Sequence, residues 1–315
     1  NIVEIAFDKG WIKAHKPENR TGKTIAVVGS GPSGLAAAQQ LNRAGHLVTV
    51  FERDSKIGGL LRYGIPDFKL EKQVIDRRVE VLEQEGIVFK TNTNVGEDVS
   101  VETLRSDFDV ILLCGGATAK RSLPIKGADL KGVVQAMDFL KLNNEYVDGL
   151  KNFKEVISAK DKNVIVIGGG DTGNDCLGTS LRHKCKSLLN FEIMPELPKA
   201  RADNNPWPLF PRIHKVDYGH EESIEVLGKD PREYSISGKE FLRDKSGKLT
   251  GIKTVMVDSA FKEIKGTEKT WKADLILLAM GFLGPENYIN QDVNIDLDER
   301  SNFKADHNIH KTSHP

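Results

Sequence analysis

A glycine-rich turn between two apolar stretches constrains the fold of this chain more than any other feature. Residues 24–28 are apolar and rich in β-branched side chains, which predicts a short buried strand. Residues 29–34 then fit the pattern G-x-G-x-x-G, and residues 35–44 have the composition of a helix. A second predicted strand, 47–51, ends at Glu52, about 20 positions after the first glycine. This order of strand, turn, helix, strand and acid is typical of the βαβ unit that binds a dinucleotide.

Each part of this unit has a physical role. Gly29 permits the tight turn, Gly31 lets the backbone approach a pyrophosphate, and Gly34 lets the helix pack closely on the strand. The N-terminus of the helix offers free N–H groups and the positive end of its dipole to the phosphates. Glu52 can accept hydrogen bonds from the hydroxyl groups of a ribose.

The same pattern recurs in the second half of the chain. Residues 163–167 predict a strand, residues 168–173 again fit G-x-G-x-x-G, and a predicted strand over 187–191 ends at Glu192. A lone G-x-G-x-x-G is weak evidence, because glycine turns between a strand and a helix are common. Two copies that agree at both the turn and the terminal acid are improbable by chance. We therefore expect the chain to hold two dinucleotide sites.

The stretches around these two units complete the predicted organisation. An apolar strand at 109–115 follows the first unit, and a similar strand at 274–281 follows the second. Three β-rich pieces within 239–271, separated by turn signals, predict an antiparallel meander. Residues 69–85 predict an amphipathic helix. Residues 123–161 are polar and partly helical, and we expect them to connect two domains.

Composition and charge argue against several classes of protein. The 315 residues suffice for two domains, and 45 basic residues balance 45 acidic ones, so charge favours neither nucleic acid nor an anionic membrane as a partner. The longest apolar run, near 275–283, is far shorter than the ~20 residues of a membrane-spanning helix. Cys114, Cys176 and Cys185 lack both C-x-x-C and metal-ligand spacing, which favours a reducing, cytoplasmic location. We expect no metal site and no catalytic triad.

Two adjacent dinucleotide sites without acid–base machinery suggest one flavin and one nicotinamide nucleotide. Hydride would pass from nicotinamide to flavin, and the protein has only to position the rings and exclude water. A non-catalytic chain would lack the same machinery, so its absence decides little. Asp171, in the first turn of the second predicted helix, has two roles open to it. Its carboxylate complements the helix dipole, but it also repels a bound pyrophosphate.

Several segments share their residues with one known family. They are 20–23, 58–66, 171–176, 191–198, Arg201, 205–211, 217–222 and 279–285. Through them the chain resembles the small (beta) subunit of glutamate synthase, in particular the version found fused in NADH-type glutamate synthases. The glycine motifs are shared with a wider flavoprotein group, including the amino-terminal part of dihydropyrimidine dehydrogenase. The segment Asn-Pro-Trp-Pro at 205–208 is much narrower.

The resemblance implies a glutathione-reductase-like α/β fold of two Rossmann-like three-layer domains, the second inserted in the first. The residues that it implies for FAD are Gly29, Ser30, Gly31, Pro32, Ser33, Glu52, Arg53, Gly59, Leu60, Lys69 and Val95. The residues that it implies for NAD(P)H are Gly169, Gly170, Asp171, Thr172, Arg201 and Gly281. In the family, electrons pass from NAD(P)H to FAD. They continue through iron–sulfur clusters to FMN on the large (alpha) subunit, the implied partner, where 2-oxoglutarate and glutamine-derived ammonia become glutamate.

The resemblance also suggests how the chain divides. The family has a cysteine-rich iron–sulfur domain before the first βαβ unit, and we expect residues 1–22 to be its remnant. We then expect an FAD-binding segment at 23–150, an NAD(P)H-binding domain at 151–281 and an incomplete return to the first domain at 282–315. The chain looks like a fragment at both ends, which puts the retention of FAD in doubt.

The choice between NADH and NADPH can be argued from Glu192, which would face the 2′ position of the adenosine ribose. At ~4 Å, a carboxylate would repel a 2′-phosphate by roughly 4 kcal/mol per unit charge at an effective dielectric near 20. No arginine is adjacent, and Arg201 lies further along the chain, so the sequence favours NADH.

Two other functions remain open at this point. The chain could be a related electron donor that uses FAD and NAD(P)H, serving dihydropyrimidine reduction or a ferredoxin. It could also be a non-catalytic nucleotide-binding fragment. The sequence leaves the oligomeric state and the final electron acceptor open.

Overall fold

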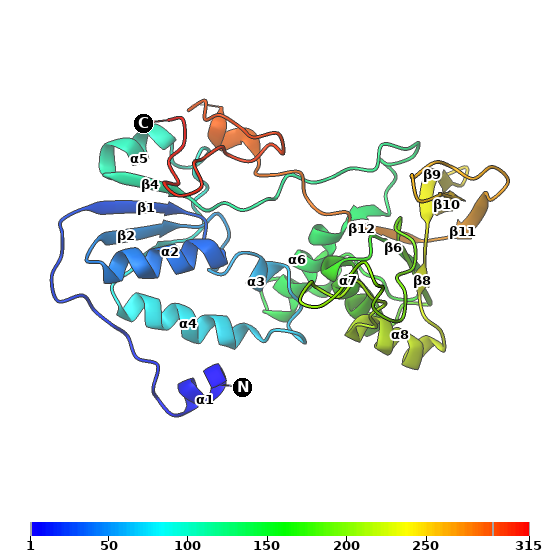
Figure 1. Ribbon diagram of the computed structural model, residues 1–315, viewed down its shortest axis with the longest axis horizontal. Helices are drawn as coiled ribbons and strands as arrows, with labels where there is room; N and C mark the ends of the chain where they lie inside the picture. Colours follow the sequence, from blue (N-terminus) through cyan, green and yellow to red (C-terminus); the bar gives the residue numbers. More distant parts are fainter. Residues whose placement is uncertain (1, 292, 315) are drawn as a thin grey trace. The chain divides into compact units, whose positions relative to one another are not determined.

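The computed structural model describes residues 2–291 and 293–314, which form two compact units (Figure 1). The first unit contains the described residues up to Ala119 and those from Phe282 onward. The second unit, Lys120–Gly281, is inserted between these two segments. Each unit is built on its own parallel sheet, as the α/β prediction requires.

The first unit has a four-stranded parallel sheet in the order β3-β2-β1-β4. Its strands are β1 (Thr24–Val28), β2 (Leu47–Phe51), β3 (Val88–Lys90) and β4 (Val110–Leu113). Its helices are α1 (Ile2–Asp8), α2 (Pro32–Arg43), α3 (Leu60–Tyr63), α4 (Lys72–Gln84), α5 (Val101–Asp107) and the 3₁₀ helix η2 (Asn287–Asn290). The central strand β1 is fully apolar in its buried part, as expected of a strand covered on both faces.

Alternate residues of β1 enter two different cores. Ile25 and Val27 pack with residues of α2 and α4. Ala26 and Val28 pack on the opposite face with residues of α5 and η2. Figure 1 shows α2 and α4 on one side of this sheet and α5 on the other. The first unit is therefore a three-layer arrangement.

The second unit has a five-stranded parallel sheet in the order β5-β12-β6-β7-β8. Its strands are β5 (Val133–Gln135), β6 (Asn163–Ile167), β7 (Ser187–Phe191), β8 (Arg232–Glu233) and β12 (Leu275–Leu278). Its helices are α6 (Ala136–Val147), the 3₁₀ helix η1 (Phe153–Glu155), α7 (Asp171–Arg182) and α8 (Tyr218–Leu227). The central strand β6 lies between β7 and β12, as β1 lies between β2 and β4, so the internal repeat extends to the sheet order.

A small antiparallel sheet covers one face of the second unit. Its strands are β9 (Ile236–Arg243), β10 (Leu249–Met256) and β11 (Lys269–Lys272), in the order β11-β10-β9. Phe241, Ile252 and Trp271 pack with Ile165 and Ile276 of the parallel sheet. The predicted β-meander is thus confirmed, and helices α6 and α7 pack on the opposite face.

The predicted boundary after residue 150 differs from the structure. Residues 120–150 lie in the second unit, where β5 pairs with β12 and extends its sheet. Phe139 and Leu140 of α6 are fully buried in the core of that unit. A strand of three residues has too few positions to show a period, which explains why this stretch looked like a connection. Among the described residues, no helix has both the length and the apolar character needed to cross a membrane.

Candidate dinucleotide sites

The two glycine-rich turns have nearly the same backbone geometry. Gly29 and Gly168 both have positive φ angles, +104° and +119°. A Cβ atom at Gly29 would collide with the carbonyl oxygen of Cys114, and one at Gly168 would collide with that of Ala279. Both positions therefore require glycine, for conformation and for space.

The third glycine of each turn allows the helix to pack on the turn. A Cβ atom at Gly34 would overlap the carbonyl oxygen of Gly29, and the equivalent overlap exists between Gly173 and Gly168. Each following helix therefore begins directly against its turn, at Pro32 in the first unit and at Asp171 in the second.

The second glycine of each turn borders open space. A Cβ atom at Gly31 or at Gly170 would meet no atom within 4 Å. The N-terminus of a twelve-residue helix, α2 or α7, starts immediately after each. Backbone N–H groups and the positive dipole end thus border this space, which fits the pyrophosphate of a dinucleotide.

The helix N-termini differ in charge. α2 has no acidic residue in its first turn and begins with Pro32, at a position where a missing N–H costs nothing. Ser33 follows it. α7 begins with Asp171 and Thr172, and Asp171 is exposed in the first turn, where it complements the macrodipole.

Hydrogen bonds repeat between the units as closely as the turns do. The N–H groups of Gly29 and Gly168 donate to the carbonyl oxygens of Phe51 and Phe191, both at 2.8 Å. At the start of the central strands, Asp109 accepts from the N–H of Thr24 at 2.8 Å. Asp274 accepts in the same way from the N–H of Asn163, at 2.9 Å. The sequence repeat is therefore a repeat of hydrogen-bonded geometry.

Glu52 is buried and braces the first glycine turn. Its Oε2 accepts from the backbone N–H of Ser30 at 3.1 Å and from the Ser30 hydroxyl. Its Oε1 accepts from the N–H of Asp54 at 2.8 Å. Ser30 Oγ also accepts from the N–H of Gly58 at 3.0 Å. One continuous network thus joins the terminal acid, the turn and the segment around Gly58.

The glycine pair at 58–59 lies directly against this turn. Gly58 and Gly59 have φ angles of +131° and +52°. A Cβ atom at Gly59 would lie 2.8 Å from the Cα of Gly31. This close approach of two backbones needs glycine at position 59, and it brings Gly59 and Leu60 to the turn that bears Gly31.

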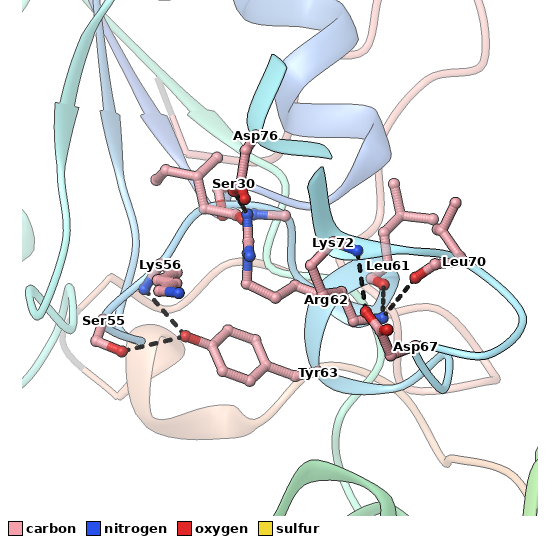
Figure 2. Close-up of polar contacts among 12 residues, drawn as sticks. Ser30, Ser55, Lys56, Leu61, Arg62, Tyr63, Asp67, Leu70, Lys72 and Asp76 are labelled. Atoms are coloured by element: carbon pink, nitrogen blue, oxygen red, sulfur yellow. Dashed lines mark hydrogen bonds and ion pairs between the residues drawn. The ribbon is translucent and has the colours of Figure 1, made fainter. Parts of the chain in front are cut away.

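Two buried cations stabilise the segment that follows the glycine pair (Figure 2). The Arg62 guanidinium donates from Nε to the carbonyl oxygen of Ile57 at 2.7 Å and forms an ion pair with Asp76. Lys72 Nζ donates to three backbone carbonyl oxygens, those of Leu61, Ile65 and Leu70. Neither cation was among the predicted residues. Arg62 follows the glycine pair and Lys72 lies in the helix predicted over 69–85, so their charge alone did not mark them as buried.

The remaining predicted FAD residues lie in the first unit. Arg53 forms an ion pair with Glu286, with 3.1 Å between Nη1 and Oε2. Val95 is buried, and the backbone N–H of Lys69 donates to the carbonyl oxygen of Pro66. Arg53 directly follows Glu52, so it lies at the same end of β2 as the acid.

Glu192 occupies the same place in the second unit as Glu52 does in the first. Its Oε1 accepts from the N–H of Met194 at 3.0 Å, which repeats the bond from Asp54 to Glu52. Its Oε2 lies so close to Gly169 that a Cβ atom there would overlap it. The terminal acid of β7 therefore faces the glycine turn of its own unit.

The described contacts of Arg201 lie within its own loop, whereas Gly281 borders open space. Arg201 Nη1 donates to the carbonyl oxygens of Asn205 and Leu209, at 3.0 and 2.9 Å, and so braces its own loop. Gly281 has a φ of +76° and no neighbouring atom within 4 Å of a Cβ position. The described contacts of Arg201 do not bring it to Glu192.

Asn190 in β7 is a polar residue that sequence reasoning missed. It is almost fully buried, and its side-chain amide donates to the carbonyl oxygen of Gly168 at 2.9 Å. The signal in the sequence was an amide side chain between apolar residues of the strand Ser187–Phe191. Cys114, by contrast, packs as a partly buried small residue against the core of the first unit, and burial raises the pKa of its thiol.

Comparisons with known proteins agree with this geometry. The family model described as pyridine nucleotide-disulphide oxidoreductase matches residues 23–204. The glutamate synthase [NADPH] small chain of Bacillus subtilis is 49% identical over 294 residues, which cover 90% of this chain and 60% of that one. Glutamate synthase [NADH] of Schizosaccharomyces pombe is 47% identical over 325 residues, which cover 100% of this chain and 15% of that one. The chain thus spans less than two thirds of the length of these relatives.

The fold is also found among solved structures. Mycobacterium tuberculosis FprA in complex with NADPH has a TM-score of 0.64 and 19% sequence identity, covering 89% of this chain and 74% of that one. The predicted FAD/NAD(P)-binding fold and the resemblance to glutamate synthase small subunits are both confirmed. The chain belongs to the pyridine nucleotide-disulphide oxidoreductase family, and within it to the relatives of the glutamate synthase small chains.

Proposed function

We propose that this chain is the electron-input part of a glutamate synthase, in which the first unit binds FAD and the second binds NAD(P)H. The nicotinamide would supply a hydride and the flavin would accept it. The observation that carries the proposal is the repeated glycine turn. Each turn has open space at its second glycine, Gly31 or Gly170, a helix N-terminus beside it, and an acid at the end of the neighbouring strand.

The chain's own residues would bind, orient and shield the cofactors. Backbone N–H groups of the two turns would hold the pyrophosphates, and Glu52 and Glu192 would accept from ribose hydroxyls. The residues proposed for FAD are Gly29, Ser30, Gly31, Pro32, Ser33, Glu52, Arg53, Gly59, Leu60, Lys69 and Val95. The residues proposed for the nicotinamide nucleotide are Gly169, Gly170, Asp171, Thr172, Glu192, Arg201 and Gly281.

NADH is the proposed nucleotide. The carboxylate of Glu192 lies beside the turn, where it would repel a 2′-phosphate, and Arg201 donates to its own loop. The relatives carry both NADH and NADPH in their names, so the proposal depends on the charge of Glu192.

The larger assembly is proposed from the names of the relatives. A small chain implies a large chain, and the S. pombe relative is one long polypeptide that includes the matched region. Electrons would leave the FAD for iron–sulfur clusters outside this chain and reach a large subunit that makes L-glutamate from L-glutamine and 2-oxoglutarate. We propose a cytoplasmic location for this assembly.

One set of absorbance spectra tests the proposal. The full-length flavoprotein should be yellow, and its flavin absorbance should bleach on addition of NADH, and less readily on addition of NADPH. A full-length protein that purified without flavin and took up none would contradict the proposal. Bleaching by NADPH alone would contradict only the choice of nucleotide.

A further inference from the structure

Different side chains hold the two glycine turns in place. This follows from two positions at which the repeats differ in sequence. In the first unit, residue 30 of the turn is serine and residue 50 of the neighbouring strand is valine. In the second unit, the equivalent positions are Gly169 and Asn190. The equivalence follows from the strand registers, because Val50 pairs with Val27 and Asn190 pairs with Val166.

Asn190 holds the second turn by its carbonyl oxygens. Its side chain is 1% exposed, and Nδ2 donates to the carbonyl oxygens of Gly168 at 2.9 Å and Val166 at 3.2 Å. Both neighbours are acceptors, so only the NH₂ end of the amide can face them. Val50 in the first unit has no group that could donate in this way.

This contact orients the peptide between Gly168 and Gly169. The peptide is trans, so its N–H group points away from its C=O group. Because Asn190 holds the carbonyl oxygen of Gly168, the N–H of Gly169 points away from Asn190. The turn so fixed leads into the N-terminus of α7, whose backbone N–H groups would bind a dinucleotide pyrophosphate.

The first unit orients the equivalent peptide from its other end. There the N–H of Ser30 donates to Glu52 Oε2 at 3.1 Å, and the hydroxyl of Ser30 donates to the same carboxylate oxygen. Glu52 is therefore part of the brace. In the second unit, Glu192 Oε2 accepts no hydrogen bond from the described residues, although it lies beside Gly169.

We propose, on the basis of the function proposed above, that Asn190 is a positioning residue for the nicotinamide nucleotide. Asn190 keeps the phosphate-binding turn of the second unit in its binding geometry, and this leaves one carboxylate oxygen of Glu192 available to the ribose. In the first unit, Glu52 Oε2 already accepts two bonds from Ser30, so a ribose hydroxyl there would share the carboxylate with the turn.

The test is a matched pair of variants at residue 190. Asn190→Val introduces the residue of the first unit. Asn190→Thr introduces a side chain of the same shape as valine, with one hydroxyl donor. The dissociation constants of NADH and of ADP-ribose are measured by calorimetry on the chain, without turnover. We expect Asn190→Val to weaken both ligands by about tenfold and Asn190→Thr to weaken them by less than threefold.

A control separates positioning from packing. Leu188→Val removes one methylene from the same face of the same strand, where Leu188 is also 1% exposed. It should lower the melting temperature and leave both dissociation constants unchanged. If Asn190→Val does not fold, Asn190→Ser and Asn190→Ala replace the pair, since they too differ by a hydroxyl.

The outcomes distinguish this inference from the proposed function. A folded Asn190→Val protein that binds within twofold of Asn190→Thr would overturn the inference, as would equal affinities for the Ser and Ala variants. A parent chain that binds neither NADH nor NADPH would instead contradict the proposed nucleotide site itself.

Discussion

Glu52 and Glu192 end equivalent strands, yet their surroundings give them different tasks. Glu52 is buried and accepts from Ser30 and Asp54. Glu192 is only half-buried, and among the described residues it accepts from Met194 through one oxygen alone. Under the proposed function, the free oxygen and the partial solvent contact of Glu192 would suit a nucleotide that leaves after each turnover.

Removing the charge of Glu192 tests the choice of nucleotide. We expect Glu192→Gln to bind NADPH more tightly, because the repulsion of a 2′-phosphate disappears while the amide oxygen can still accept from a ribose hydroxyl. Solvent screens a half-exposed charge, so the ratio of the NADPH and NADH dissociation constants should fall by about tenfold rather than by the full Coulomb term.

The measurement is equilibrium titration of both nucleotides on the same preparation. Glu225→Gln, which neutralises an exposed carboxylate on α8, is the control and should leave the ratio unchanged. An unchanged ratio in Glu192→Gln would mean that Glu192 does not face the 2′ position.

At the scale of elements, the start of each central strand is hydrogen-bonded to an aspartate that directly precedes a neighbouring strand. Asp109 precedes β4 and binds the first residue of β1, where Oδ2 accepts from the N–H of Thr24. Its Oδ1 accepts from Lys23 Nζ at 2.9 Å. The bonds from Thr24 and Lys23 lower the pKa of Asp109 to about 2. Asp274 fastens β6 through Asn163 in the same manner.

The lowered pKa predicts a pH dependence with a definite sign. Because the folded protein holds Asp109 as a carboxylate, its contribution to stability is present above pH ~4, the ordinary pKa of aspartate. It is lost as the pH falls toward about 2, the folded pKa of Asp109. We expect Asp109→Asn to melt at a lower temperature than the parent at pH 7, since an amide cannot accept the three bonds from Lys23 and Thr24 as well.

The measurement is thermal unfolding followed by circular dichroism across this pH range. The difference in melting temperature between Asp109→Asn and the parent should shrink steadily between pH ~4 and ~2. Asp107→Asn, at the exposed end of α5, is the control. A difference that stayed constant with pH would exclude the carboxylate of Asp109 as its cause.

At the scale of the whole molecule, the chain has two units with separate cores, one inserted in the other. The inserted unit begins at Lys120, so β5 and α6 belong to it. Phe139 and Leu140 are fully buried in its core. Burying one such side chain contributes about 1.5–3 kcal/mol, whereas the net stability of a domain is only about 5–15 kcal/mol.

Two excised segments test this assignment. Residues 120–281 expressed alone should unfold cooperatively and bind NADH with the affinity of the whole chain. Residues 151–281 should not, because they lack β5, which extends the sheet beside β12, and the buried face of α6. Circular dichroism melts and NADH titration provide the measurements. Equal cooperativity and affinity for the two segments would place the functional boundary at 150 after all.

Local sequence determined both βαβ units, down to their terminal acids. A strand, a glycine turn and an amphipathic helix each carry a pattern that neighbouring residues supply, so β1, α2, β2 and their counterparts β6, α7 and β7 could be predicted. The meander strands followed from β-rich composition and turn signals, for which no partner distant in sequence is needed. The insertion of one unit in the other was implied by the family resemblance.

Only the tertiary structure decided which groups those elements bring together. No sequence pattern predicts that Asn190 donates to Gly168 or that Ser30 donates to Glu52. The same is true of Lys72, which donates to three carbonyl oxygens. The sequence also did not predict β5, whose three residues can be recognised as a strand only from their pairing with β12. Local patterns arise from interactions along a few turns of chain. A buried polar group is instead satisfied by whichever distant atom the packing places next to it.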